Sequence, residues 1–357
     1  MFYKKLTIGK KLFYNMFTSV FLLFSLSLFI ACEKEEKQDN DFPEIIAGEG
    51  VFIINEGNYN RGNASLGYID LMNNKEYFEI FNKSNNRQLG DVFQSISLIN
   101  DHLFLVINNS GKIEIINPNS VEVETTITGL GSPRKILDIS QNKALVSDLY
   151  SNKIALIDLE NYAVENYIDV SGWTEDIIKS GEKIFISNMD NNIVYSIDIE
   201  TLMITDSIAT FPVPNSMVED INGNIWVLCS GSTGKSLPGG LIGFDPITNN
   251  TIKSIEFPGH FPPASKLNIN AGGDSLYFIS EDIWRISIND SNLPENPFYR
   301  ANGRNFYGLG ISPHDGKVFI SDAVDFVQKG KAIIINNNGE TIAEYNTGII
   351  PGGFFFY

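Results

Sequence analysis

Two sets of polar and aromatic residues recur along this chain, and their types suit contact with a ligand. The first set directly follows short apolar runs and comprises Asn55, Asn108, Asp148, Asn188, Cys229, Ser280 and Asp322. The second set lies in longer polar segments and comprises Arg87, Arg134, Trp173, Glu175, Pro214, Asn215, His260, Phe261, Arg304, Phe306 and Tyr307. Amides, guanidinium groups and aromatic rings can hydrogen-bond and stack, so together they suit contact with a ligand.

From these sets, together with two tyrosines beside the first set, the sequence predicts one ligand-binding site. Its predicted residues are Tyr59, Arg87, Asn108, Arg134, Asp148, Tyr150, Trp173, Glu175, Asn188, Arg304 and Tyr307. Structural alternatives stay open for several of them. A polar residue after a strand can cap backbone N–H groups, Trp173 can fill a loop, and Arg134 can serve the scaffold.

Patterns typical of catalysis or metal binding are weak by comparison. The segment 229–236 nearly spells a phosphate-binding loop, but Cys229 replaces its first glycine and the segment joins two predicted strands. The three histidines fall in different repeats without metal-ligand spacing, and no serine elbow or Cys–His pair stands out. Calcium at Asp148 and Asp322 is an alternative to backbone capping by the same carboxylates. We therefore predict no catalytic residue, no metal site and no cofactor.

A repeat of short strands must position these residues. Seven times an apolar residue is followed by Asp or Asn where a strand should turn back, at intervals of 47, 41, 40, 47, 44 and 47 residues. The pairs are Ile69-Asp70, Ile116-Asn117, Ile157-Asp158, Ile197-Asp198, Phe244-Asp245, Ile288-Asn289 and Ile335-Asn336. Asp and Asn open tight turns by hydrogen-bonding the backbone two residues on. A 40–50-residue period of short strands predicts an all-β, seven-bladed β-propeller of four-stranded blades.

The two ends of the repeat array predict how the ring closes. The first repeat starts at Val51 with its second strand and lacks an inner strand, whereas the last repeat overruns through residues 351–357. That tail aligns with the segments that open the inner strands of the third and fifth repeats, at Pro133 and Pro214. We therefore expect the C-terminal strand to complete blade one, which leaves no free sheet edge at the closure.

The loops of such a ring divide between two faces. The Asp and Asn pairs mark turns on one face, where other connections are also short and offer little to grip a ligand. The links between second and third strands share the opposite face with the crossovers between blades. We therefore expect the binding site on this longer-looped face.

The N-terminus reads as a targeting segment. A basic region with four lysines precedes the apolar run Val20 to Ala31, which ends at Cys32. We predict a lipoprotein signal peptide over 1–31, lipidation of Cys32, a flexible acidic tether over 32–48 and a single propeller over 49–357. Loss of the four lysines at 1–31 would change the formal net charge from −17 to −21. An acidic surface of this kind disfavours nucleic acid and anionic membranes, so the predicted membrane contact is the lipid anchor alone.

Several motifs resemble those of a known family. They are the lipobox-like run ending at Cys32, and the segments 55–59, 108–112, 132–134, 147–152 and 350–354. Over about residues 45–357 the chain is similar to YncE-like seven-bladed propeller lipoproteins of the Bacteroidetes. Within that group it most resembles the BtuG-type surface proteins that capture cobalamin.

The resemblance implies a surface-exposed outer-membrane lipoprotein that binds cobalamin (vitamin B12) or a related corrinoid. It would pass this ligand to a TonB-dependent outer-membrane transporter. Two alternatives stay open. One is a non-catalytic interaction propeller for a different transporter or surface complex, and the other is a lactonase- or dehydrogenase-like propeller enzyme.

Overall fold

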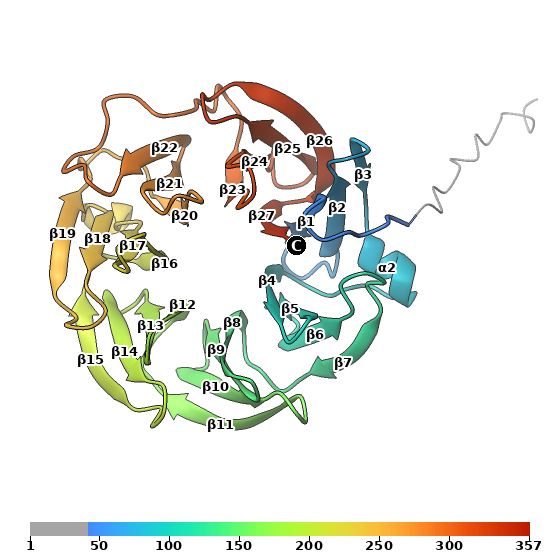
Figure 1. Ribbon diagram of the computed structural model, residues 1–357, viewed down its shortest axis with the longest axis horizontal. Helices are drawn as coiled ribbons and strands as arrows, with labels where there is room; N and C mark the ends of the chain where they lie inside the picture. Colours follow the sequence, from blue (N-terminus) through green and yellow to red (C-terminus); the bar gives the residue numbers. More distant parts are fainter. Residues whose placement is uncertain (1–41) are drawn as a thin grey trace, which may run out of the picture. The chain divides into compact units, whose positions relative to one another are not determined.

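The structure is a computed structural model that describes residues 42–357. The unit Pro43–Tyr357 is a closed ring of seven antiparallel sheets around a central axis, with the chain running once round the ring (Figure 1). The predicted seven-bladed, all-β propeller is confirmed. Among residues 42–357 no helix is long and apolar enough to cross a membrane.

Each of the first five blades has four strands, which follow one another from the axis outward in the order below. Blade 1 contains β27 (Pro351–Phe356), β1 (Gly50–Asn55), β2 (Ser65–Asp70) and β3 (Lys75–Tyr77). Blade 2 contains β4 (Phe93–Ile99), β5 (His102–Ile107), β6 (Lys112–Ile116) and β7 (Val123–Ile127). Blade 3 contains β8 (Pro133–Ser140), β9 (Lys143–Asp148), β10 (Lys153–Asp158) and β11 (Ala163–Asp169). Blade 4 contains β12 (Thr174–Ser180), β13 (Lys183–Asn188), β14 (Ile193–Asp198) and β15 (Ile204–Ala209), and blade 5 contains β16 (Pro214–Glu219), β17 (Ile225–Cys229), β18 (Gly240–Phe244) and β19 (Thr251–Glu256).

The last two blades differ in strand number. Blade 7 has four strands, β23 (Phe306–Ile311), β24 (Val318–Asp322), β25 (Lys329–Ile335) and β26 (Thr341–Ile349), whereas blade 6 has three, β20 (Ser265–Ile269), β21 (Ser275–Ser280) and β22 (Asp282–Ser287). The four-stranded prediction is therefore wrong for blade 6. The segment after β22 carries Pro294 and Pro297, which have no N–H for a sheet ladder, and it makes only an isolated bridge from Tyr299 to Ile283. Two short helical elements, α2 (Ile80–Asn85) and η1 (Thr233–Lys235), lie in connecting segments.

The C-terminal strand closes the ring as predicted. β27 pairs antiparallel with β1 and supplies the inner strand of blade 1 (Figure 1). Phe354 and Phe356 pack on Phe319 of blade 7, with ring centroids 5.6 and 5.0 Å away. One strand therefore joins the first and last blades through both backbone hydrogen bonds and an aromatic cluster.

Hydrophobic layers between neighbouring blades form the core. The second strand of each blade is almost entirely buried, and the buried side chains form clusters that each span two adjacent blades. A fully buried aromatic such as Phe185, whose ring lies 5.1 Å from that of Phe244 in the next blade, contributes about 1.5–3 kcal/mol by leaving water. Repetition of such contacts makes the ring a rigid frame for the axis.

The Asp and Asn pairs open the outer turns of the blades, as their spacing indicated. Asp158 Oδ1, for example, accepts hydrogen bonds from the backbone N–H groups of Glu160 and Asn161 at 2.8 and 3.2 Å. In the sixth repeat the carboxylate that accepts such a bond belongs to Asp290, which receives the N–H of Ser287 at 3.0 Å.

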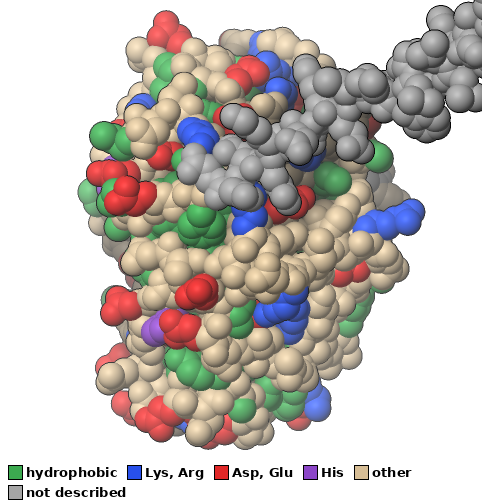
Figure 2. All heavy atoms as spheres, turned by 90° about the vertical axis from the view of Figure 1, so that its right-hand side faces the viewer, with side chains coloured by type: hydrophobic (Ala, Val, Ile, Leu, Met, Phe, Trp, Pro, Cys, Tyr) green, Lys and Arg blue, Asp and Glu red, His purple; other side chains and the backbone are tan. Residues whose placement is uncertain are grey.

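The described N-terminal residues pack on the propeller. Pro43 and Ile45 are buried, and the N–H of Gly48 donates to the carbonyl of Tyr357 at 2.5 Å. The compact unit thus begins before residue 49, inside the predicted tether, because these apolar side chains are buried and the backbone of Gly48 bonds to the C-terminal residue. The predicted signal peptide and Cys32 lie outside the described residues. On the side of the unit shown in Figure 2, acidic, basic and hydrophobic side chains are interspersed.

Candidate functional site

A cavity of about 510 Å³ lies on the axis of the propeller, where the inner strands begin. That end carries the crossovers and the links between second and third strands, so the cavity is on the longer-looped face. Four predicted site residues line it, namely Arg134, Trp173, Glu175 and Tyr307. Residues from all seven blades contribute to its wall.

A β-bulge at the same place in every inner strand builds this wall. In each blade the pairing with the second strand skips the second residue of the inner strand. The skipped residues, which we call the bulge ring, all line the cavity: Gly352, Gln94, Arg134, Glu175, Asn215, Lys266 and Tyr307. A bulge re-aims a side chain that the regular pleat would place elsewhere. Seven equivalent bulges therefore give the cavity wall seven positions, each with a different residue type.

The glycine of the bulge ring makes room for a carboxylate from the neighbouring strand. A Cβ on Gly352 would lie 2.3 Å from Oε1 of Glu56, which directly follows β1. Glu56 itself is almost fully buried and lines the cavity. Blade 1 thus presents Glu56 at the position where the other blades present their bulge residue.

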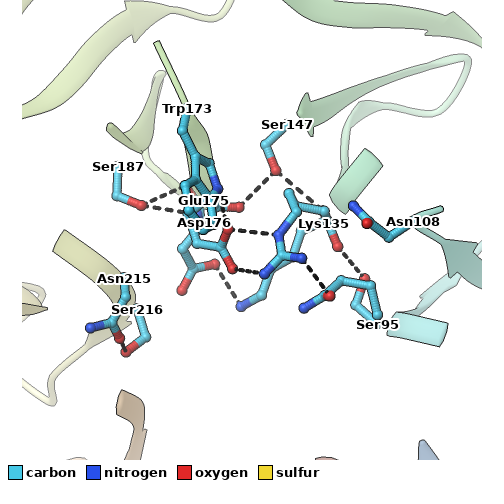
Figure 3. Close-up of polar contacts among 12 residues, drawn as sticks. Ser95, Asn108, Lys135, Ser147, Trp173, Glu175, Asp176, Ser187, Asn215 and Ser216 are labelled. Carbon is cyan, nitrogen blue, oxygen red and sulfur yellow. Dashed lines mark hydrogen bonds and ion pairs between the residues drawn. The ribbon is translucent and has the colours of Figure 1, made fainter. Parts of the chain in front are cut away.

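Arg134 and Glu175 form the strongest polar contact in the wall. The Arg134 Nε and Nη2 atoms donate to the two oxygens of Glu175, both at 2.6 Å, and Nη1 donates to Gln94 Oε1 at 2.6 Å. Trp173 Nε1 donates to Glu175 at 2.6 Å, and the Arg134 guanidinium lies 5.6 Å from the Trp173 ring centroid. Figure 3 shows Glu175 at the centre of these contacts, with Trp173 above it. Burial alone would lower the pKa of Arg134, but Glu175 raises it above its ordinary value, so the guanidinium stays charged.

A second ion pair lies directly behind the first. Lys135 Nζ contacts Asp176 Oδ1 at 2.6 Å, and Asp176 Oδ2 accepts the backbone N–H of Met217 at 2.7 Å. Ser147 Oγ donates to the Glu175 carbonyl at 2.7 Å, which ties blade 3 to blade 4 (Figure 3). These contacts join blades 3, 4 and 5 at the cavity wall and hold its shape.

The opposite part of the wall contains a looser charged group. The Tyr307 hydroxyl donates to Glu56 Oε2 at 2.9 Å, while Lys266 Nζ lies 4.0 Å from Glu56 Oε1 and 5.5 Å from the Tyr307 ring centroid. Burial, with Glu56 beside it, raises the pKa of Tyr307, so the hydroxyl is protonated and can donate. Burial lowers the pKa of Lys266, Glu56 opposes this change, and the positive charge of Arg134 adds to it.

The chain matches one family model. The model described as "Domain of unknown function (DUF5074)" covers residues 49–356. The chain belongs to the DUF5074 family. No curated protein matches this DUF5074 chain.

Solved structures share the fold of this DUF5074 propeller at low sequence identity. A quinonprotein alcohol dehydrogenase-like protein from Bacteroides thetaiotaomicron aligns with a TM-score of 0.69 and 15% identity, over 87% of this chain and 78% of that one. A protein from Lactobacillus plantarum aligns with a TM-score of 0.65 and 11% identity, over 87% and 99%. A functionally unknown protein from Desulfotomaculum acetoxidans aligns with a TM-score of 0.61 and 14% identity, over 85% and 98%. These likenesses show the propeller fold and nothing about activity.

Three predicted site residues of the DUF5074 propeller are buried caps and do not line the cavity. Asp148 accepts the backbone N–H groups of Ser132, Tyr150 and Ser151 at 2.6–2.8 Å. Asn188 donates to the carbonyl of Ser171 at 2.7 Å, and Asn108 donates to that of Pro133 at 3.0 Å and stands apart from the polar network in Figure 3. These three residues therefore cap backbone groups of the connecting segments. They position the bulge ring from behind, because the crossovers that they hold lead into the inner strands.

Two predicted arginines lie away from the axis. Arg87 makes a bidentate pair with Glu114 of β6, both contacts at 2.9 Å, and Arg304 pairs with Glu344 of β26, the outermost strand of blade 7, at 2.6 Å. Neither Arg87 nor Arg304 therefore lines the cavity with Arg134. Tyr59 and Tyr150 are exposed, at 69% and 76%, on links between second and third strands.

The sequence prediction did not include Glu56, Gln94 and Lys266 among the site residues. Alignment of the seven inner strands by their first residues would have identified Gln94 and Lys266. Each is the second residue of its strand, as Arg134 is. Glu56 has no such signal, because it reaches the wall only through the space above Gly352.

Metal-ligand groups and activated thiols are not part of this site. Over residues 42–357 no three or more His, Cys, Asp or Glu side chains gather where they could hold a metal ion. Burial raises the pKa of the Cys229 thiol to about 12, so it remains protonated. The phosphate-loop-like segment after Cys229 joins β17 to β18 and lines a separate hollow of about 280 Å³ with residues 259–262.

Proposed function

We propose that this DUF5074 propeller captures cobalamin or a related corrinoid without transforming it. The observation that carries the proposal is the central cavity, whose wall displays an amide, an indole, a phenol and ion-paired groups on a frame of seven bulged strands. A rigid wall limits the entropy lost on binding, and a corrinoid is itself a rigid, amide-edged molecule. The family resemblance of the sequence motifs points to the same ligand.

The size of the cavity determines how such a ligand would bind. A space of about 510 Å³ is smaller than a whole corrinoid, so the macrocycle would lie across the mouth and insert one part. Trp173, which stands at the mouth beside the Arg134–Glu175 pair, would then face the macrocycle. The exposed tyrosines on the neighbouring links would lie around the ligand.

The retention of colour tests this proposal directly. Purified protein is incubated with cyanocobalamin and desalted, and the red ligand should co-elute with it. Trp173→Ala should weaken binding by about tenfold or more, as for a central aromatic anchor. Tyr167→Ala, on the outer strand β11 of blade 3, serves as the matched control and should bind normally. Loss of all colour, with no heat of binding by calorimetry, would refute corrinoid capture.

We further propose that Cys32 is lipidated, that the protein is surface-exposed on the outer membrane, and that a TonB-dependent transporter receives the ligand. The support is the sequence of the N-terminus together with the family resemblance. Metabolic labelling with a radioactive fatty acid should mark the wild-type chain and not Cys32→Ser. Protease added to intact cells should degrade the protein, and an affinity-tagged chain should co-purify a transporter.

A second candidate is a pure interaction propeller. Four links between second and third strands expose large apolar side chains, including Tyr59, Tyr150, Leu237 and Val327, and such side chains often mark contact sites. Co-purification of a transporter without any heat of binding for cyanocobalamin would favour this candidate over ligand capture.

A further inference from the structure

The charged side chains of the cavity wall are unequally paired. Arg134 is bound by both oxygens of Glu175 at 2.6 Å, and Lys135 is bound by Asp176 at 2.6 Å. Of the three cations that line the described cavity, Lys266 has the longest ion pair, at 4.0 Å from Glu56. Glu56 already receives the Tyr307 hydroxyl on its other oxygen.

The backbone fixes the direction of Lys266. It is the bulge residue of β20, with a positive φ of 61°, and Asn268 donates to its carbonyl oxygen at 3.1 Å. Its side chain keeps 30% exposure and faces the cavity beside the Tyr307 ring. An ammonium that has lost much of its hydration and lacks a close carboxylate gains strongly from a charge-assisted hydrogen bond to an anion.

The other cations of the wall are closely paired with carboxylates, whereas Lys266 is not. The facing groups are Glu56, Tyr307, Arg134, Lys135 and Glu175, which belong to or follow strands of blades 1, 7, 3 and 4. Arg134 and Glu175 neutralise each other, Lys135 is neutralised by Asp176, and Glu56 is the one remaining carboxylate.

We infer that the cavity takes the phosphodiester of the corrinoid nucleotide loop, with Lys266 as its binding cation. This inference rests on the proposed function. The phosphodiester is the anionic group of a cobalamin, whereas the side chains of its macrocycle are neutral amides. The nucleotide loop is also a part of the ligand small enough to insert while the macrocycle covers the mouth.

A comparison of two corrinoids tests the inference. Calorimetry measures the binding of cyanocobalamin and of dicyanocobinamide, which has the same macrocycle but no nucleotide loop. Wild type should bind cyanocobalamin about tenfold or more tightly than dicyanocobinamide, equivalent to about 1.4 kcal/mol or more. Lys266→Met should weaken cyanocobalamin binding far more than dicyanocobinamide binding and so remove that preference, and Lys266→Arg should restore part of it. Lys331→Met, whose lysine pairs with Asn346 on the outer strands of blade 7, is the matched control.

The outcomes separate this inference from the proposed function. Equal effects of Lys266→Met on both corrinoids would overturn the phosphodiester assignment while leaving corrinoid capture standing. If wild type binds neither corrinoid, the proposed function fails and the corrinoid assignment fails with it, and a titration with dimethyl phosphate then tests the anion site at Lys266 by itself. Saturable heat in wild type that disappears in Lys266→Met would support an anion site at Lys266, and no heat in wild type would overturn it. A melting curve for each variant identifies any that fails to fold.

Discussion

Replacement of Glu175 by Gln tests the idea that the Arg134–Glu175 pair holds the cavity wall. Glu175 accepts three short hydrogen bonds, two from Arg134 and one from Trp173, each at 2.6 Å. Glutamine has nearly the same shape but no charge, and its amide nitrogen would face a donor. The side chains of Arg134 and Glu175 are only 15% and 12% exposed, so solvent screens the loss little.

The expected cost follows from the burial of the remaining guanidinium. Removal of one partner of a buried pair leaves an uncompensated charge and costs about 3–5 kcal/mol. For a unit of the size of Pro43–Tyr357, this corresponds to a fall in melting temperature of about 5–8 °C. Arg134→Met in the Glu175→Gln background should recover part of the loss, because the buried charge is then absent.

Urea unfolding of wild type, the two single variants and the double variant measures this coupling. The two single changes should not be additive, and the interaction free energy should exceed about 1 kcal/mol, as for residues in one network. A Glu175→Gln protein within about 0.5 kcal/mol of wild type, or strict additivity, would refute a stabilising role for the pair. If a Glu175→Gln protein melts normally but binds the ligand more weakly, Glu175 acts by contacting the ligand and not by stabilising the cavity wall.

Three further predictions concern closure, packing and charge. Deletion of residues 351–357 should leave β1 without an inner partner and open the ring. The truncated protein should therefore melt far below wild type or not fold. An unchanged melting temperature would contradict closure of the ring by this strand. Gly352→Ala should lower the free energy of unfolding by about 1–3 kcal/mol, because its Cβ would lie 2.3 Å from Glu56 Oε1. Glu56→Ala in the same chain should restore most of that loss. A Gly352→Ala protein as stable as wild type would show that Glu56 can move aside freely. The pKa of Lys266 is lowered mainly by burial, so the unfolded chain binds more protons between the folded pKa and about 10.5, and the free energy of unfolding should rise with pH in that window. Lys266→Met should remove this rise in urea titrations at several pH values, and equal slopes in both proteins would contradict it.

The period of the sequence predicted the architecture well because it reflects local chemistry. Apolar runs of a few residues bury between blades, and Asp or Asn after them opens a turn through its own backbone, as at Asp158. The missing inner strand at Val51 and the overrun at Pro351 likewise predicted the closure. Blade 6 departed from the pattern because its outer segment contains Pro294 and Pro297, which cannot complete a ladder.

The site was predicted only in part. Arg134, Trp173, Glu175 and Tyr307 do line the cavity, but polar residues that look equally suitable proved to be caps, such as Asp148, or peripheral ion pairs, such as Arg87. Residue type alone cannot separate these roles, because an amide or carboxylate after a strand is equally fit to hold a backbone N–H or a ligand.

The sequence by itself determined the number of blades, the closing strand and the face with the longer loops. Only the tertiary structure decided which charges meet on the axis. Arg134 and Lys266 occupy equivalent bulges, yet Arg134 meets Glu175 from the next blade, whereas Lys266 shares Glu56 with Tyr307 at a longer distance. Each of these partners lies some 40 residues or more away in the chain, and they meet because seven bulged strands converge on one axis.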